Sequence, residues 1–243
     1  MKKILVISDN YALVKHFQYV EKKISSKIAL FTYCYSAINK STKDLESLGM
    51  SVIDLKNTDN VDSIILNYDL VISAHCKQIF PKILVRSVRC INIHPGLNPH
   101  NRGWFPQVFS IINKKPIGCT IHVMDEEIDH GDIIYQQELT ILESDTSLDV
   151  YTRVVEAEKS LIDLHIVSLI NEEYTTTKLT NDGNYNGIQD FNTLRCLDLE
   201  SKGTLREHLD LLRALSHGAF RNAYFLDQSG NKIFVRLILE RDI

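Results

Sequence analysis

Short apolar runs alternate with amphipathic segments over the first hundred residues. The first run, KKILVIS at 2–8, precedes a segment with helical spacing at 11–22. Further runs follow at 28–33, 50–55, 69–75 and 88–96, with helical segments at 39–49 and around 61–66. Continuous branched runs of this length are typical of parallel strands buried on both faces. The pattern predicts a doubly wound, Rossmann-like α/β fold with a mostly parallel sheet and right-handed crossovers.

The middle of the chain predicts an extension of that sheet. After a helical segment at 106–115, two alternating runs at 118–124 and 132–141 flank the polar connection DEEIDHG. Two strands around such a connection indicate antiparallel pairing. A long amphipathic helix follows at 146–170, with Thr146 as its N-cap.

The last seventy residues have a different character. The stretch 171–192 is rich in Asn, Thr and Gly and predicts a bridge out of the main domain. A helix at 204–216 and a hairpin at 222–239, turning at 228–231, complete the chain. We therefore expect a main α/β domain at 1–180 and a small C-terminal α+β region at 181–243. The second region is too small to fold alone, which favours a homodimer.

Composition and charge narrow the classes of partner. The chain has 243 residues and a formal net charge of -4, which lacks the basic excess of a nucleic-acid surface. The N-terminal segment has too short an apolar stretch for a signal peptide or a membrane span. Five scattered cysteines without a CxxC pair argue against a disulfide framework and a metal site. We expect a cytoplasmic protein with reduced thiols, no bound metal, and neither nucleic-acid nor membrane partners.

The stretch CINIHPGLNPHNRGWFPQ at 90–107 carries the candidate chemistry. Asn92 and His94 are two residues apart on a predicted strand, so their side chains project from the same face. They lie at the carboxyl end of the strand, where doubly wound folds bind ligands. A turn cap and a core histidine are the structural alternatives. The loop 125–132 supplies a carboxylate, and spacing alone leaves five acids open: Asp125, Glu126, Glu127, Asp129 and Asp132.

An amide, an imidazole and a carboxylate around one cleft suit acyl transfer. The amide stabilises an oxyanion, the imidazole acts as a base, and the carboxylate supports the imidazole. The sequence contains no G-x-S-x-G nucleophile elbow, so direct transfer between two bound substrates is favoured over a covalent enzyme intermediate. An adjacent carboxylate is expected to raise the pKa of His94, so activity should climb between about pH 6 and 8.

Three motifs resemble one enzyme family. NIHPG at 92–96, the following Pro99, and GCTIHVMDEEIDHGDII at 118–134 are similar to the 10-formyltetrahydrofolate-dependent formyltransferases. The resemblance implies an Asn92, His94 and Asp129 catalytic triad. The segments 73–81 and 101–113 look like the sugar N-formyltransferases in particular, over residues 1 to about 170, and the tail more loosely. The family's frequent HPSLLP appears as HPGLNP, so Gly96 and Asn98 depart from it.

The resemblance also implies ligands and their contacts. It implies N10-formyltetrahydrofolate as co-substrate, bound by Cys76, Gln78, Ile79, Asp125 and Ile128. The acceptor would be a nucleotide-linked amino sugar, such as dTDP-4-amino-4,6-dideoxyglucose, for O-antigen or lipopolysaccharide biosynthesis. Its expected contacts are Asn10, Lys77, Arg102, Trp104 and Tyr224, although each also has a structural interpretation, as a turn, surface, loop-anchor or core residue.

Three other functions remain open from the sequence. Formylation of methionyl-tRNA is disfavoured by the acidic balance and by a tail that lacks the pattern of an OB barrel. Hydrolysis of formyltetrahydrofolate would use the same three residues with water as acceptor. A binding protein without catalysis would retain the pocket but has no need for all three of them.

Overall fold

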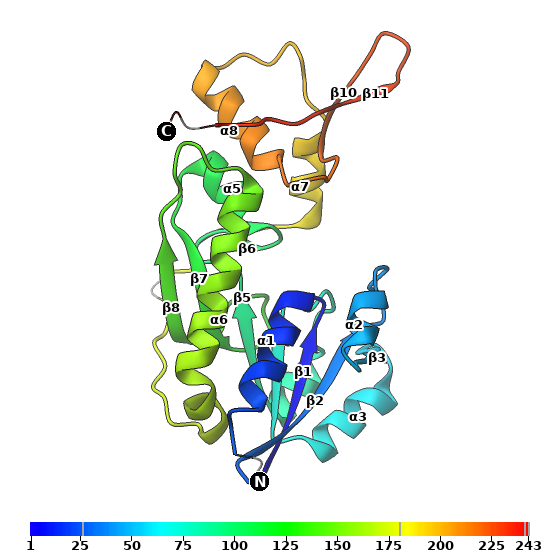
Figure 1. Cartoon of the computed structure of the whole chain (residues 1–243), viewed down its shortest axis with the longest axis vertical. Coiled ribbons are helices and arrows are strands. Elements are labelled where there is room, and N and C mark those ends of the chain that lie inside the picture. Colours follow the sequence, from blue (N-terminus) through cyan, green and yellow to red (C-terminus); the bar gives the residue numbers. More distant parts are fainter. Residues whose placement is uncertain (26, 180, 241, 243) are drawn as a thin grey trace.

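A computed structural model describes residues 1–25, 27–179, 181–240 and 242. Its main body is a seven-stranded sheet in the order β3-β2-β1-β4-β5-β7-β8 (Figure 1). These strands are β1 (Lys2–Ser8), β2 (Ala29–Ser36), β3 (Ser51–Ile53), β4 (Leu70–Ala74), β5 (Arg89–His94), β7 (Ile117–Val123) and β8 (Ile133–Leu139). Strands β1 to β5 pair in parallel, whereas β7 and β8 extend the sheet with antiparallel pairing. The predicted fold class is confirmed.

Helices cover both faces of the sheet. They are α1 (Tyr11–Glu21), α2 (Lys43–Ser47), α3 (Thr58–Asn67), α4 (Lys82–Ser87), α5 (Pro106–Asn113) and α6 (Ser147–Asn171). Along β1, Ile4 and Val6 pack in the core that contains α1 and α6, while Leu5 and Ile7 pack in the core that contains α3 and α4. Burial on both faces is the reason why these strands read as continuous apolar runs.

The tail forms a smaller body beside one end of the sheet (Figure 1). It contains α7 (Ile188–Arg195), α8 (Leu205–Leu215) and a hairpin of β10 (Ala223–Leu226) and β11 (Lys232–Val235). The predicted helix and hairpin are present, but α7 lies partly within the stretch predicted as a bridge. The division at residue 180 stays a prediction.

The polar stretch before the tail does not simply leave the main body. Its β9 (Tyr185–Asn186) pairs in parallel with β6 (Arg102–Gly103), a short strand in the loop after β5. No apolar pattern marks either two-residue strand, so the sequence did not reveal this return. Within the described residues, no helix is both long and apolar enough to cross a membrane.

Candidate active site

Asn92, His94 and Asp129 meet at the carboxyl end of β5. The Asn92 amide donates from Nδ2 to Asp129 Oδ1 at 2.9 Å. His94 Nδ1 lies 3.4 Å from Asp129 Oδ2. The two strand residues are held by pairing with β4 and β7, and Asp129 is delivered by the turn between β7 and β8. The structure thus brings the three predicted residues together.

Burial decides the charge of His94. The side chain is almost fully buried, and this burial lowers its pKa to about 4 although the Asp129 carboxylate favours the charged form. The expectation that Asp129 would raise the pKa above its usual value is therefore wrong, because loss of solvation outweighs the charge. His94 is a neutral imidazole near pH 7. Its Nε2 is buried without a hydrogen-bond partner among the described residues.

Asp129 is held as a carboxylate by several neighbours. Burial alone would raise its pKa, but His94, His122 and the Gly103 N–H hold that pKa well below the usual range. Gly103 N donates to Asp129 Oδ2 at 3.0 Å, and Asn98 Nδ2 donates to the Asp129 carbonyl at 2.9 Å. Asp129 itself adopts a left-handed conformation with φ of 50°. Side chain and backbone are both fixed in place.

His122 is a fourth member of this cluster that the sequence did not reveal. It lies directly opposite Asn92 in the β5–β7 register, with Nε2 3.3 Å from Asn92 Nδ2 and 3.7 Å from Asp129 Oδ1. Its place on an alternating strand showed which face it occupies but not which residue it opposes. That depends on the antiparallel register, which spacing does not give.

The departures from the family's loop pattern have structural reasons. A Cβ at Gly96 would come within 2.4 Å of His94 Nε2, so a larger residue would displace the imidazole. Asn98 is buried, and its backbone carbonyl accepts a hydrogen bond from Gln136 Nε2. Its side-chain amide donates to the backbone carbonyl of Asp129. Gly96 therefore leaves room for the His94 imidazole, and Asn98 helps to hold Asp129 in place.

A cavity of about 440 Å³ opens beside the cluster. Asn92, His94 and Asp129 line it together with most of the residues predicted to bind ligands, namely Asn10, Cys76, Lys77, Gln78, Ile79, Trp104, Asp125 and Ile128. Ile79, Trp104 and Ile128 expose apolar surface there. A concave site with exposed apolar side chains and a few convergent polar groups is typical of a small-molecule site.

Several of these residues already have partners within the protein. Asn10 caps α1 through its Oδ1 and uses its Nδ2 on Tyr151. Gln78 bridges the backbone at Ile53 and Leu55. Lys77 is exposed as a residue, and its Nζ donates to Asn39 Oδ1. These contacts fix the cavity wall before any ligand arrives.

Two of the predicted binding residues do not line the cavity. Arg102 is buried, and its guanidinium donates to the carbonyl of Ile128 at 3.1 Å. Tyr224 lies on the β10–β11 hairpin, where its ring contacts Phe234 and Lys232. The roles proposed for both in acceptor binding stay predictions.

The cavity also contains polar residues that the sequence did not single out. Asp9 accepts from Ser36, Asn39 and the Lys77 N–H at the ends of β1 and β2. His75 and Tyr151 line another part of the wall. Within the described part of the chain, no three His, Cys, Asp or Glu side chains gather in a way that could hold a metal ion.

Comparison with known proteins agrees with this geometry. Residues 14–166 match the formyl transferase family. The chain belongs to the formyltransferase family. Residues 190–241 match the N-formyltransferase dimerization C-terminal domain. A dTDP-4-amino-4,6-dideoxyglucose formyltransferase of Mycobacterium tuberculosis is 50% identical to this formyltransferase over 182 residues, which are 75% of this chain and 78% of that one.

Solved structures of other formyltransferases have the same fold. A sugar N-formyltransferase from a Shewanella species is 54% identical, with a TM-score of 0.98 and full coverage of both chains. A 4-N formyltransferase from Francisella tularensis is 46% identical, with a TM-score of 0.92 over 99% of each chain. An N-formyltransferase from Helicobacter canadensis, solved with folinic acid and dTDP-3-aminofucose, shares the fold at 22% identity, with a TM-score of 0.72 over 88% of this chain and 80% of that one.

Proposed function

We propose that this formyltransferase moves the formyl group of N10-formyltetrahydrofolate to the amine of a nucleotide-linked amino sugar, with dTDP-4-amino-4,6-dideoxyglucose as the first candidate. The observation that carries the proposal is the Asn92, His94 and Asp129 cluster on the wall of a cavity that is large enough for small molecules. The likeness to a dTDP-4-amino-4,6-dideoxyglucose formyltransferase supports this acceptor.

Each residue of the cluster has a distinct role in the proposed reaction. The neutral His94 presents Nε2, which has no partner in the part of the chain that the structure describes, as the acceptor for a proton of the attacking amine. Asp129 accepts from the Asn92 amide and lies beside His94 Nδ1, which fixes the orientation of both side chains. One N–H of the Asn92 amide points toward Asp129 and the other toward His122. The oxyanion would accept a hydrogen bond from the N–H that points toward His122.

The folate would lie against the 76–79 and 125–129 segments. Exposed Ile79 and Ile128 offer apolar surface to a flat ring. His94 lines the same cavity, and its Nε2, which has no hydrogen-bond partner among the described residues, fits a site built around a polar ligand. When bound, N10-formyltetrahydrofolate supplies the formyl group. Folinic acid in the distant Helicobacter canadensis structure supports a folate in this fold.

The acceptor would occupy the remaining wall. Lys77 is the exposed cation of that wall, which suits a diphosphate, and Trp104 offers a flat apolar surface to the sugar. Asn10 would act through Tyr151 rather than on the substrate, given its internal contacts. For Arg102 we retain the proposed electrostatic contribution to the diphosphate, and for Tyr224 the contact with the nucleotide.

A mixing experiment tests the proposal and separates its rivals. Formyltetrahydrofolate is incubated with and without a panel of nucleotide amino sugars carrying the amine at C3 or C4, and tetrahydrofolate release is followed. Release that requires the C4 amino sugar is the expected result. Release without acceptor would indicate a hydrolase, and no release with any acceptor would indicate a binding protein.

The wider setting of the reaction is also a proposal. The tail's match to a dimerization domain supports a homodimer, with no need for nucleic acid or membrane. The five cysteines are free thiols, which suits the reducing cytoplasm. A formylated nucleotide sugar is an activated donor, so we propose that a glycosyltransfer reaction of surface polysaccharide or O-antigen synthesis consumes the product.

A further inference from the structure

A second polar cluster borders the cavity on the other side of the catalytic histidine. His75 follows β4 as His94 ends β5, and the pairing of Ala74 with Ile93 places the two histidines at equivalent positions of neighbouring parallel strands. A proton added to His75 would lower the pKa of His94, so the two rings are electrostatically coupled. His75 lines the cavity, so an imidazole outside the catalytic cluster faces the same space.

His75 is bound to a buried carboxylate on α6. Its Nε2 lies 2.8 Å from Glu158 Oε1, and Glu158 is fully buried. The other carboxylate oxygen, Oε2, has no hydrogen-bond partner among the described residues. His75 reaches this position through a left-handed backbone, with φ of 55°. Burying such a pair and straining its backbone both cost stability, which indicates a functional constraint.

The hydrogen bonds around His75 assign its proton. Asn10 Nδ2 donates to Tyr151 OH at 2.8 Å and lies 3.1 Å from His75 Nδ1. Because an amide N–H can only donate, His75 Nδ1 is an acceptor and its ring proton sits on Nε2, toward Glu158. Tyr151 OH is 3.2 Å from the same Nδ1 and lines the cavity. A carboxylate, an imidazole and a hydroxyl thus form a chain that ends at the cavity wall.

The acceptor chemistry can use one more base than the proposed catalytic cluster contains. An amino sugar is largely an ammonium ion near pH 7, and it must lose one proton before its nitrogen can attack. His94 then has to accept a further proton during the attack itself. We propose that Glu158, His75 and Tyr151 form a relay that takes the ammonium proton of the bound acceptor, an inference that rests on the proposed amine acceptor.

The relay step balances without a further reactant. The ammonium N–H bond breaks as its proton passes to the Tyr151 oxygen. The Tyr151 proton passes to the lone pair of His75 Nδ1, from which the Asn10 N–H withdraws while it keeps its contact with Tyr151. The products are the neutral amine and an imidazolium whose charge is offset by the Glu158 carboxylate. The proton leaves through the open cavity after turnover. Tyr151 meets substrate, whereas Glu158 is a positioning residue that acts through His75.

The groups that face the relay come from four parts of the chain. Asn10 is the N-cap of α1, Tyr151 and Glu158 belong to α6, and His94 belongs to β5. From the tail, the His217 ring lies 5.4 Å from the Tyr151 ring. Burial raises the pKa of Glu158, although His75 opposes this, and burial raises the pKa of Tyr151 to about 12, so Tyr151 keeps its proton near pH 7.

The pH profile of Glu158→Gln tests the relay. Gln has the same shape but no charge, so the imidazolium at His75 loses its partner. The variant should lose about 100-fold in kcat/KM at pH 6.5, and the loss should shrink to about threefold at pH 9.5, where the acceptor amine is already neutral. In the variant, the logarithm of kcat/KM should rise with pH with unit slope up to the pKa of the free amine. In the wild type, kcat/KM should depend less steeply on pH.

Two further variants make the result decisive. His75→Asn tolerates the left-handed backbone and should repeat the profile of Glu158→Gln. Asp163→Asn is the matched control, because Asp163 lies on the same helix and pairs with His16 at 3.1 Å away from the cavity. It should behave as wild type. An equal loss at every pH in folded Glu158→Gln or His75→Asn overturns the relay, whereas absence of turnover in the wild type overturns the proposed function itself.

Discussion

His94 shows how far burial changes the chemistry of a residue. Its spacing from Asn92 was enough to predict that both face one point. Its charge was not predictable, because the burial that lowers the pKa comes from the surrounding strands and loops. Asp129 was chosen among five acids by resemblance alone. In the structure Asp129 is the acid that contacts Asn92 and His94. Asp125 pairs with His130 instead, and Glu126 with Arg86 and Lys82.

Removal of either strand residue should abolish most of the activity without unfolding the protein. Asn92→Ala and His94→Asn should each lower kcat by at least about 100-fold, because one removes the oxyanion donor and the other the base. Steady-state kinetics together with circular dichroism measures this. Asn67→Ala, at the exposed end of α3, is the control. Near-normal turnover in either variant would remove that residue from the mechanism.

The buried His94 should also make the protein sensitive to acid. The unfolded chain binds this proton below about pH 6.5, whereas the folded chain binds it below about pH 4. Between these values the unfolded state holds more protons, so the stability is complete above pH 6.5 and is lost as the pH falls toward 4. A shift of this size corresponds to about 3 kcal/mol.

Urea unfolding of the ligand-free protein at pH 7 and pH 4.5 measures this effect. His94→Gln should flatten the pH dependence of the free energy of unfolding, because Gln does not titrate. His208→Gln, on α8, should leave the slope of the wild type unchanged. A slope in His94→Gln as steep as that of the wild type would mean that other groups cause the acid sensitivity.

At the scale of elements, the short β6–β9 pair links the polar stretch before the tail to Asp129. The backbone N–H of Arg102 donates to the carbonyl of Asn184, and that of Trp104 donates to the carbonyl of Asn186. The Gly103 N–H between them donates to the Asp129 carboxylate. The Oδ1 of buried Asn101 accepts hydrogen bonds from the side-chain amides of Asn184 and Asn186, which holds the two short strands together. The long strands and helices were predictable from periodicity. Two-residue strands held by asparagine side chains have no period, so the sequence could not reveal them.

Gly103→Ala should therefore damage catalysis from outside the triad. A Cβ there would come within 2.5 Å of Asn186 O, and φ is 92°. Displacing the strand withdraws the N–H from Asp129, and we expect a fall in kcat of about 10-fold or more, as for a lost positioning contact. Gly49→Ala is the matched control, since its φ is 77° but nothing lies within 4 Å of the added Cβ. Equal kcat in the two variants would show that β6 does not position Asp129.

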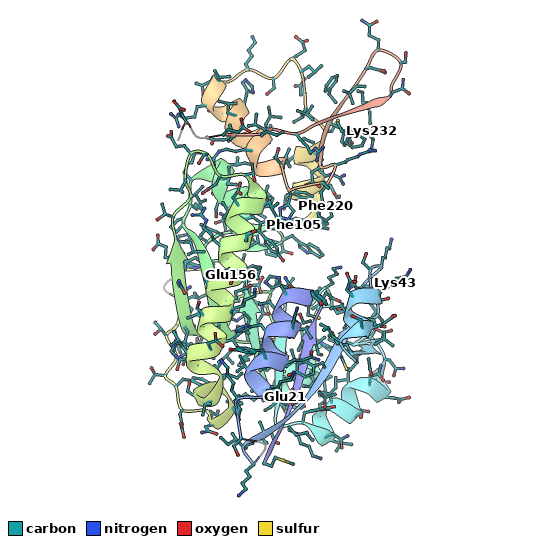
Figure 2. The ribbon with its side chains drawn as sticks, viewed as in Figure 1. Glu21, Lys43, Phe105, Glu156, Phe220 and Lys232 are labelled. Carbon is teal, nitrogen blue, oxygen red and sulfur yellow. The ribbon has the colours of Figure 1, made fainter. Side chains whose placement is uncertain are left out.

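At the scale of the whole molecule, the tail is anchored firmly to the main body. Asp210 on α8 accepts from Lys114 and Arg213, and Arg213 donates to the carbonyls of Leu142 and Asp145. Ring contacts run from His75 through Tyr151 and His217 to Phe220. Figure 2 labels Phe105 on the main body and Phe220 on the tail, at the level where the two parts meet. The tail therefore has a fixed position relative to the cavity.

The outer face of the hairpin should form part of a dimer contact. Leu226 and Phe234 share one face of β10 and β11, where Leu226 is 50% and Phe234 41% exposed. Apolar residues grouped in this way on a tail that matches a dimerization domain favour burial against a second copy.

Light scattering should give twice the mass of the 27.8 kDa chain. The double variant Leu226→Ser/Phe234→Ser should shift the protein toward the single-chain mass, because it removes apolar area from the contact. Leu66→Ser, at a leucine on α3 that is 83% exposed, should leave the mass unchanged. A wild-type mass of one chain would overturn the homodimer, and a dimeric double variant would move the contact to another face of the tail.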